Sequence, residues 1–173
     1  PTSKPIAALA AALTLLALPA AAPASERSTA RYLQTIRDDP AALRDFLWAM
    51  PKGADLHNHL SGSVYAESMV RWGAEDGVCV STTTWVARPG PCAEGERPLA
   101  DALSDGTLYD AVLRAWSMKG FRDGEVSGHD HFFATFGRFG GANTRRAGDM
   151  LAEVTRRAAA QNEQYLETML TPA

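Results

Sequence analysis

The spacing of apolar residues changes along the chain, and the first clear pattern is helical. Between residues 39 and 51 the apolar positions recur at i, i+3, i+4 and i+7, which is one face of a helix, and they are Leu43, Phe46, Leu47 and Met50. Asp39 suits the N-cap and Pro40 the first helical position, and Pro51 would end the helix. The preceding STARYLQTIRDD is predicted to be a shorter helix.

Two short apolar segments are predicted to be strands. KGADLHNHL at 52–60 is bounded by Gly53 and Gly62, and a helix from Ser63 to Glu75 follows it. QYLETML at 164–170 comes after a long helical pattern that runs from residue 144 to about residue 162. Because a long crossover separates the two strands, we expect them to be parallel neighbours.

The residues between these strands add an insertion and further helices. The stretch 78–105 is rich in turn signals and long for a simple connection, so it is predicted to be an insertion with its own hairpin. Thr107-Leu-Tyr-Asp110 resembles a capping box, and the apolar face behind it consists of Leu108, Ala111, Val112, Ala115 and Trp116. HDHFFATFGRFGG at 129–141 is predicted to form a short aromatic helix or gate, which Gly140-Gly141 would end.

This order of elements places the chain in the α/β class. It reads as helices, a strand, a helix, an insertion, helices and a second strand. Only two segments look like good interior strands, which is too few to close a sheet. We therefore expect the N-terminal part of a larger protein, with a helical extension at 25–50 and an incomplete domain at 51–173.

Composition and charge exclude some classes of partner. The chain is 46% hydrophobic and 21% charged, as globular proteins are. Its net charge of −3 provides no basic surface for nucleic acid or for anionic lipid. We therefore expect no nucleic-acid partner, while the oligomeric state stays open.

The first 24 residues have the pattern of a secretory signal peptide. Lys4 precedes an uncharged run from Ile6 to Leu18, and Ala22-Pro23-Ala24 supplies an A-x-A cleavage pattern before Ser25. The run is shorter than the roughly 20 residues that span a membrane. We expect a secreted or periplasmic protein without a stable membrane anchor. The alternative is an Ala-rich helix of the folded domain, which the lack of polar periodicity disfavours.

Two cysteines fit an exported protein. Cys79 and Cys92 bracket VSTTTWVARPGP, which has β-branched residues and a Pro-Gly turn signal. In an oxidising compartment they are candidates for a disulfide, and two free buried thiols are the alternative. Neither lies in a C-x-x-C, which disfavours a zinc ribbon or a thioredoxin-like site.

The sequence contains two H-x-H pairs, and the element on which each lies distinguishes them. On a strand, residues i and i+2 point to the same face, so that His57 and His59 can converge on one cation. On a helix the same spacing diverges by about 200°, which is the case for His129 and His131 in the aromatic segment. Only the first pair is predicted to be a metal site, although ordinary hydrogen-bonded histidines remain the alternative.

Neighbouring residues have two interpretations each. Asp55 is expected on the same face as His57, where it would support a metal ligand or pair with a Lys or Arg. His129 and His131 are expected to cap or anchor the aromatic segment, and contact with a substrate is the alternative. Its phenylalanines are pocket lining or ordinary core, and they are Phe132, Phe133, Phe136 and Phe139.

Three of these stretches together resemble a known family. MPKGADLHNHLSGSVYAE at 50–67 resembles the first-strand signature of the adenosine deaminase family, within the metal-dependent amidohydrolases. The leader, the cysteine-bearing insertion and HDHFFATFGRF are similar to its secreted, growth-factor-related branch. AAAQNEQYLETMLTP resembles the helix and second strand of the same barrel.

The resemblance implies a fold and a set of site residues. The fold would be the N-terminal portion of a (β/α)8 TIM barrel, with its first two strands, their flanking helices and a cysteine-containing insertion. One Zn²⁺ would be held by His57 and His59. A purine nucleoside would contact His59 and Ser61, where family members often have Asp, and an aromatic gate of Phe133 and Phe136 would cover it. The catalytic residues of the family would lie beyond Ala173.

The resemblance also implies an activity. Zinc held by neutral imidazoles lowers the pKa of its water to about 7, and the expected reaction is hydrolytic deamination of adenosine to inosine and ammonia. Two ligands do not complete a catalytic zinc site, so we expect this stretch alone to be inactive. The alternatives are an amidohydrolase acting on a different amine or amide, and a non-catalytic extracellular growth-factor-like binding protein.

Overall fold

A computed structural model describes residues 25–122, 124 and 126–170. The predicted signal peptide at 1–24 lies outside the described residues. The chain divides into two compact units after Phe46, and each unit is described by itself.

The first helices begin at side-chain caps. In α1 (Glu26–Ile36) the hydroxyl of Ser25 accepts the backbone N–H of Ser28 at 3.2 Å, so the helix starts two residues earlier than predicted. In α2 (Pro40–Ala49) the Asp39 carboxylate accepts two backbone N–H groups, at 3.0 and 3.1 Å, as the sequence predicts. The predicted apolar face of α2 is not fully buried within the described part of the chain, because its residues Leu47 and Met50 are 44% and 39% exposed.

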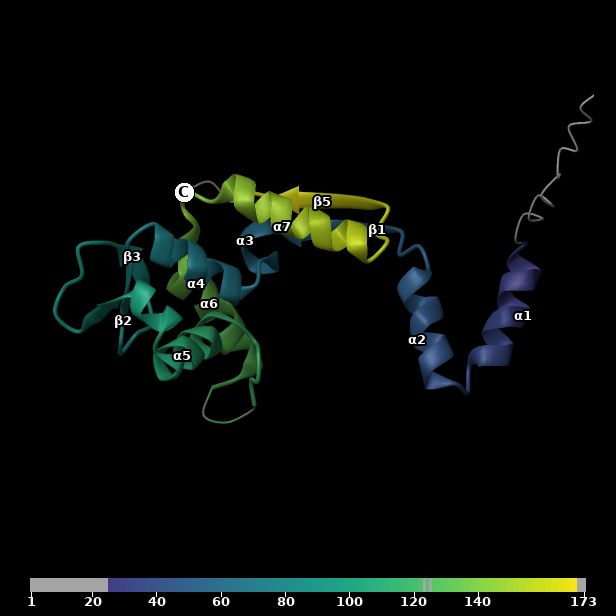
Figure 1. The fold of residues 1–173 in the computed structure, drawn as a ribbon, viewed down its shortest axis with the longest axis horizontal. Helices are drawn as coiled ribbons and strands as arrows, with labels where there is room; N and C mark the ends of the chain where they lie inside the picture. Colours follow the sequence, from purple (N-terminus) through teal and green to yellow (C-terminus); the bar gives the residue numbers. More distant parts are fainter. Residues whose placement is uncertain (1–24, 123, 125, 171–173) are drawn as a thin grey trace, which may run out of the picture. The chain divides into compact units, whose positions relative to one another are not determined.

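The two predicted strands pair in parallel, which confirms that expectation. They are β1 (Ala54–His59) and β5 (Tyr165–Met169), and they form a two-stranded sheet. Figure 1 shows the two strands side by side. The preceding helix α7 (Ala147–Ala160) is shorter than predicted at both ends. Its Met150 and Val154 are buried in the core against which Leu166 of β5 packs.

The helix predicted at 63–75 is two helices in the structure, which corrects the prediction. They are α3 (Leu60–Ser63) and α4 (Ala66–Glu75), and the backbone between them is extended at Val64 and Tyr65. Two side chains of α7 hold this break. Glu153 accepts the backbone N–H of Tyr65 at 2.9 Å, and Arg157 donates to the carbonyl of Ser63. These tertiary contacts override the helical pattern of the sequence.

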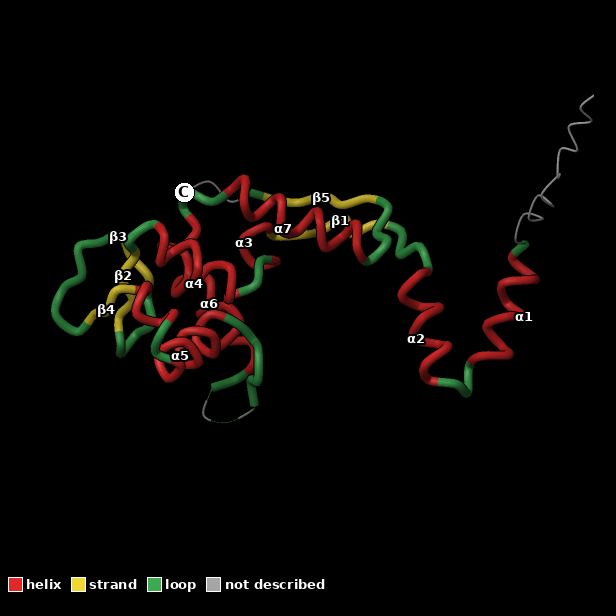
Figure 2. Tube along the Cα trace, viewed as in Figure 1, coloured by secondary structure: helices red, strands yellow, loops and turns green. Residues whose placement is uncertain are grey.

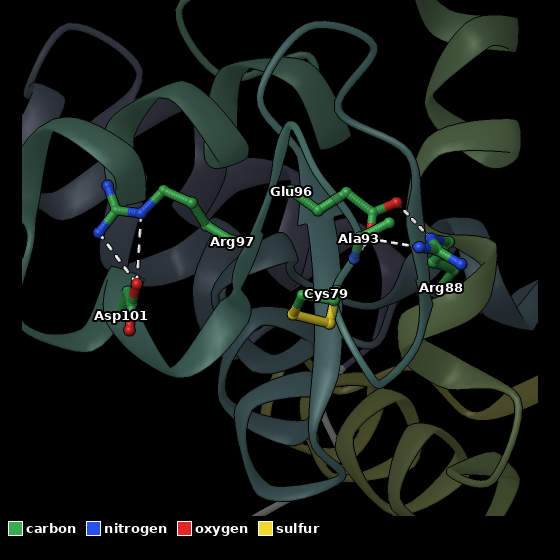
Figure 3. Close-up of a disulfide and its surroundings, with 7 residues drawn as sticks. Cys79, Arg88, Ala93, Glu96, Arg97 and Asp101 are labelled. Carbon is green, nitrogen blue, oxygen red and sulfur yellow. Dashed lines mark hydrogen bonds and ion pairs between the residues drawn. A yellow bond between two sulfur atoms is a disulfide. The ribbon is translucent and has the colours of Figure 1, made fainter.

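The insertion forms a small antiparallel sheet. Its strands β2 (Val78–Ser81), β3 (Ala87–Pro89) and β4 (Glu96–Pro98) have the order β3-β2-β4, and η1 (Leu99–Leu103) follows them. The predicted hairpin is therefore present, with one strand more. Cys79 and Cys92 form a disulfide, and the ion pair of Arg88 with Glu96 joins β3 to β4 beside it (Figure 3).

The remaining helices differ from the prediction at their ends. The N-cap of α5 (Gly106–Trp116) is Asp105, which accepts the N–H groups of Thr107 and Leu108, so Thr107 is not the cap. The aromatic helix α6 (Gly128–Asn143) continues through Gly140 and Gly141. A Cβ at Gly141 would lie 2.2 Å from the carbonyl oxygen of Ala87, so this glycine permits close packing on β3 and does not end the helix.

The described residues form a mixed α/β structure. They contain seven α-helices, one 3-10 helix and two small sheets, and these sheets close no barrel (Figure 2). The second unit has one hydrophobic core in which α4, α5 and α6 pack with the insertion. Its most deeply buried large side chains are Leu60, Met69, Val70, Val80, Leu99 and Val112.

Candidate functional site

The two histidines of β1 lie close together. The ring centroids of His57 and His59 are 5.2 Å apart, and the ring planes meet at 69°. Both residues are exposed, and His59 is the last residue of the strand. The carboxyl ends of parallel strands are where functional side chains gather in α/β folds, so the pair lies where a site is expected.

A β-bulge precedes the pair and changes which side chains face each other. Asp55 pairs with Leu166 and Asn58 with Thr168. Between these two pairs β1 advances by three residues (58 − 55) and β5 by two (168 − 166). A bulge of this kind bends the strand and re-aims its side chains. Asp55 consequently lies beside Asn58, whose Nδ2 donates to its Oδ2 at 3.0 Å. The expectation that Asp55 shares the face of His57, which assumed regular alternation, is wrong.

The Asp55 carboxylate is held by two donors. Its Oδ1 accepts the backbone N–H of His57 at 3.1 Å, and its Oδ2 accepts the Asn58 amide. These hydrogen bonds, the one from His57 first, hold the pKa of Asp55 below its ordinary value. The carboxylate therefore stays ionised at neutral pH and fixes the backbone at His57.

Asn58 is the centre of a polar network around the pair. Its Oδ1 accepts the hydroxyl of Ser63 at 2.8 Å and that of Thr168 at 3.2 Å. The Ser63 hydroxyl also lies 3.1 Å from the carbonyl oxygen of His59. One asparagine side chain thus connects the bulge, the turn after β1 and the neighbouring strand β5.

His57 and His59 line a cavity, and aromatic side chains form one of its walls. Its volume is about 440 Å³, and its lining comprises His57, Asn58, His59, Gly62, Ser63, Phe132, Phe133 and Phe136. The aromatic rings come from α6, where the ring centroid of Phe132 lies 5.2 Å from that of Phe133 and 5.4 Å from that of Phe136. The structure therefore brings Phe133 and Phe136 together with the histidine pair.

Gly62 sets the width of this cavity beside Phe136. A Cβ at Gly62 would lie 2.9 Å from Cζ of the Phe136 ring, which is closer than non-bonded carbon atoms normally approach. The absence of a side chain therefore lets the aromatic ring lie against the turn that follows β1.

Ser61 does not line the cavity of the histidine pair. It lines a different cavity of about 460 Å³, together with Met150, Met169 and Leu170. The hydroxyl in the cavity of the histidine pair belongs to Ser63. The structure therefore does not bring Ser61 together with His57 and His59, because the chain turns into the short helix α3 directly after His59.

The second H-x-H pair diverges, as its helical position predicts. The His129 ring packs on Phe133, with centroids 4.8 Å apart. Nε2 of His131 donates instead to the carbonyl oxygen of Ser117 at 3.0 Å, and its ring lies 4.9 Å from Phe121. His131 therefore anchors α6 to the segment before it, whereas the contacts of the exposed His129 side chain, with Phe133 and Asp130, lie within α6.

The distance between the ring centroids of His57 and His59 equals that expected for two imidazoles on one zinc ion, and it also equals that of rings in ordinary contact, such as Phe132 and Phe133. With Zn–N bonds of about 2.1 Å and tetrahedral geometry, two imidazole centroids lie ~3.2 Å from the ion and ~5.2 Å from each other. The observed separation is 5.2 Å, and imidazole is a ligand type that zinc favours. Across residues 25–170, with 123 and 125 excepted, no group of three or more His, Cys, Asp or Glu side chains is arranged to hold a metal.

Sequence reasoning missed two residues of this site. The sequence indicated no role for Asn58, and Ser63 was predicted only as the first residue of a helix. Polar side chains directly beside a predicted ligand pair were the available signal, since metal-binding histidines are usually supported by hydrogen bonds.

In the described part of the chain no helix is long and apolar enough to cross a membrane.

Comparisons with other proteins give no assignment. The chain matches no family profile, no curated protein and no solved structure.

Proposed function

We propose that this chain supplies the first two ligands of a zinc-dependent hydrolase that converts adenosine and water to inosine and ammonia. The observation that carries the proposal is the geometry of His57 and His59, whose ring centroids are 5.2 Å apart at the mouth of an aromatic cavity. The choice of adenosine deamination as the reaction comes from the resemblance of residues 50–67 to the adenosine deaminase signature.

In this proposal β1 and β5 are the first two strands of a (β/α)8 barrel. Their parallel pairing and the long crossover between them support this assignment. The insertion with β2, β3 and β4 then lies within the crossover, on the way from the first barrel strand to the second. Catalytic groups of such barrels stand at the carboxyl ends of the strands, where His59 ends β1.

The residues of this chain have distinct roles in the proposed site. His57 and His59 bind the metal as neutral imidazoles, and zinc, when bound, supplies a water molecule acidified for attack on C6 of the purine. Phe132, Phe133 and Phe136 form the wall against which a planar base can stack.

Metal content and ammonia release test this proposal. In the full natural protein we expect bound zinc and release of ammonia from adenosine. His57→Ala and His59→Ala should each remove the zinc and lower kcat/KM by at least about 10³-fold, because a metal site of this kind depends on every ligand. The measurements are metal analysis by mass spectrometry and a coupled ammonia assay.

His129→Ala is the matched control. It removes a histidine of the other H-x-H pair, whose ring packs on Phe133. It should leave the zinc content unchanged. A wild-type protein without zinc, or one whose zinc survives both His57→Ala and His59→Ala, would contradict the proposed function.

A second candidate activity follows from the position of Ser61. The resemblance assigns the nucleoside sugar to Ser61, but this residue lines another cavity. That placement favours an amidohydrolase that acts on a different amine or amide. Ammonia release from free bases and simple amides, with none from adenosine, would select this candidate.

We also propose that the protein is secreted or periplasmic. The disulfide between Cys79 and Cys92 supports an oxidising compartment. The signal-peptide pattern of residues 1–24 supports the same assignment.

A further inference from the structure

Asn58, the residue between the two histidines, forms side-chain hydrogen bonds with three other residues. Asn58 is half-buried and uses both ends of its amide. Nδ2 donates to Asp55, while Oδ1 accepts from Ser63 and from Thr168. The three partners come from three different segments, which are the start of β1, the end of α3 and β5.

Two of these partners also hold the backbone of the histidines. The Asp55 carboxylate accepts the N–H of His57, and the single proton of the Ser63 hydroxyl is shared between Asn58 Oδ1 and the carbonyl oxygen of His59, which lies at the longer distance. A third partner, Thr168, lies 3.3 Å from the carbonyl oxygen of Asn58 itself. Three backbone groups, the N–H of His57 and the carbonyl oxygens of Asn58 and His59, therefore contact residues that the Asn58 side chain connects.

The bulge makes such support necessary. Between the pairing of Asp55 with Leu166 and that of Asn58 with Thr168 the ladder is interrupted, and the interruption contains His57. A residue in a bulge lacks regular ladder hydrogen bonds, so the orientation of the His57 ring depends on other contacts. The Asp55 carboxylate, to which Asn58 donates, supplies one such contact at the backbone N–H of His57.

From this geometry we infer that Asn58 is a positioning residue for the histidine pair. It sets the separation of the two imidazole rings by holding the bulge, the turn after β1 and β5 in one arrangement. The inference rests on the proposed function, in which His57 and His59 bind zinc. Groups that orient metal ligands in this way typically change metal affinity by about 10–100-fold when they are removed.

The chemistry of the side chain restricts what can replace it. An aspartate at 58 has no N–H to donate and would place a second carboxylate beside Asp55. A leucine has similar size and neither donor nor acceptor, and it would leave the hydroxyls of Ser63 and Thr168 without this partner. Only an amide of this length donates on one side and accepts two hydroxyls on the other.

Zinc affinity in the full natural protein tests the inference. Asn58→Leu should weaken zinc binding by about 10–100-fold, as measured by competition with a chromophoric chelator. Thr168→Val, which removes one of the two hydroxyls that donate to Asn58, should weaken zinc binding by a smaller factor. Thr168→Ser keeps the hydroxyl and should bind zinc with the wild-type affinity. Thr155→Val is the matched control, because its hydroxyl bonds to carbonyl oxygens of its own helix, and it should leave the affinity unchanged.

A readout on the metal-free protein separates positioning from simple loss of fold. The imidazole resonances of His57 and His59, observed with labelled histidine, should shift in Asn58→Leu while those of His129 and His131 stay in place. Circular dichroism should show the same helix content in every variant. A change of all four histidines together would indicate unfolding and would overturn the inference.

The outcomes distinguish the two proposals. If zinc binds and depends on His57 but has wild-type affinity in Asn58→Leu, the positioning role of Asn58 is overturned and the proposed function stands. If the wild-type protein binds no zinc at all, the proposed function fails, and the positioning role for zinc fails with it.

Discussion

At the scale of single residues, Arg146 joins two helices through the carboxylates of Asp76 and Glu75. Its Nε donates to Oδ2 of Asp76 at 2.8 Å, and its Nη2 donates to Oδ1. The side chain of Arg146 is only 17% exposed. The pair connects the end of α4 to the N-cap of α7, the helix that supports the break after α3.

This pair predicts a specific dependence of stability on pH. The hydrogen bonds from Arg146 lower the pKa of Asp76 from 3.8. Because the folded pKa is below the unfolded value, the contribution to stability is complete above pH 3.8 and is lost as the pH falls through the folded value. Asp76→Asn should therefore lower the melting temperature at pH 7 and reduce the loss of stability on acidification below about pH 4.

Melting curves between pH 2 and pH 8 check this prediction. Asp38→Asn is the control, because it makes the same change of charge at an exposed residue that has no ion pair among the described residues. Parallel curves for wild type and Asp76→Asn at every pH would show that the pair contributes nothing that depends on protonation.

The candidate site shows how far single residues could be predicted. The histidine pair was found because its period of two matches a strand, and the structure places the two rings together. The positions of Asp55 and Asn58 were not found, because one extra residue in a bulge reverses the alternation that follows it. Nothing in the spacing of KGADLHNHL indicates that bulge.

At the scale of elements, α6 lies unusually close to β3. A Cβ at Gly141 would lie 2.2 Å from the carbonyl oxygen of Ala87 and 3.0 Å from Cα of Arg88. Both are backbone atoms, which cannot move aside as the end of a flexible side chain can. The aromatic helix, which carries one wall of the candidate site, is thus fixed to the insertion through this glycine.

Gly141→Ala should therefore destabilise the protein. Overpacking of this kind typically costs about 1–3 kcal/mol and sometimes more, and urea unfolding measures it. Gly137→Ala is the matched control on the same helix, where a Cβ meets nothing within 4 Å. It should stabilise by about 0.5–1 kcal/mol, since alanine is the better helix former. Equal effects of the two substitutions would contradict the close packing of α6 on β3.

Elements with a strong local signal were predicted best. Asp39 and Pro40 located α2, and the apolar strands with their long crossover gave the parallel pair β1 and β5. The break between α3 and α4 was missed because distant residues of α7 cause it, chiefly Glu153 and Arg157. Gly140 and Gly141 suggested a helix end, but the second glycine is required by packing against β3.

At the scale of the whole molecule, the disulfide links stability to the redox state of the surroundings. Cys79 lies in the core at 1% exposure, in the central strand of the insertion, and Cys92 lies in the loop between β3 and β4. Closing a loop of this length stabilises a protein by about 3 kcal/mol in the chain-entropy model. That is a large part of the stability of a typical domain.

Reduction should therefore lower the melting temperature of the protein by roughly 10 °C. The measurement is a thermal scan with and without a thiol reductant. The double variant Cys79→Ala/Cys92→Ala should already melt at the lower temperature and should not respond to the reductant. A response of the double variant equal to that of the wild type would show that the reductant acts elsewhere.

The cross-link between Cys79 and Cys92 also determines how proteolytic cleavage of the chain would appear on a gel. The turn at Thr82–Thr84 is exposed and lies between the two cysteines, so a protease that cuts there separates the chain into two pieces that remain covalently joined. On a denaturing gel without thiol, such a nicked molecule would migrate as an intact one. Only a reduced sample would reveal the two pieces.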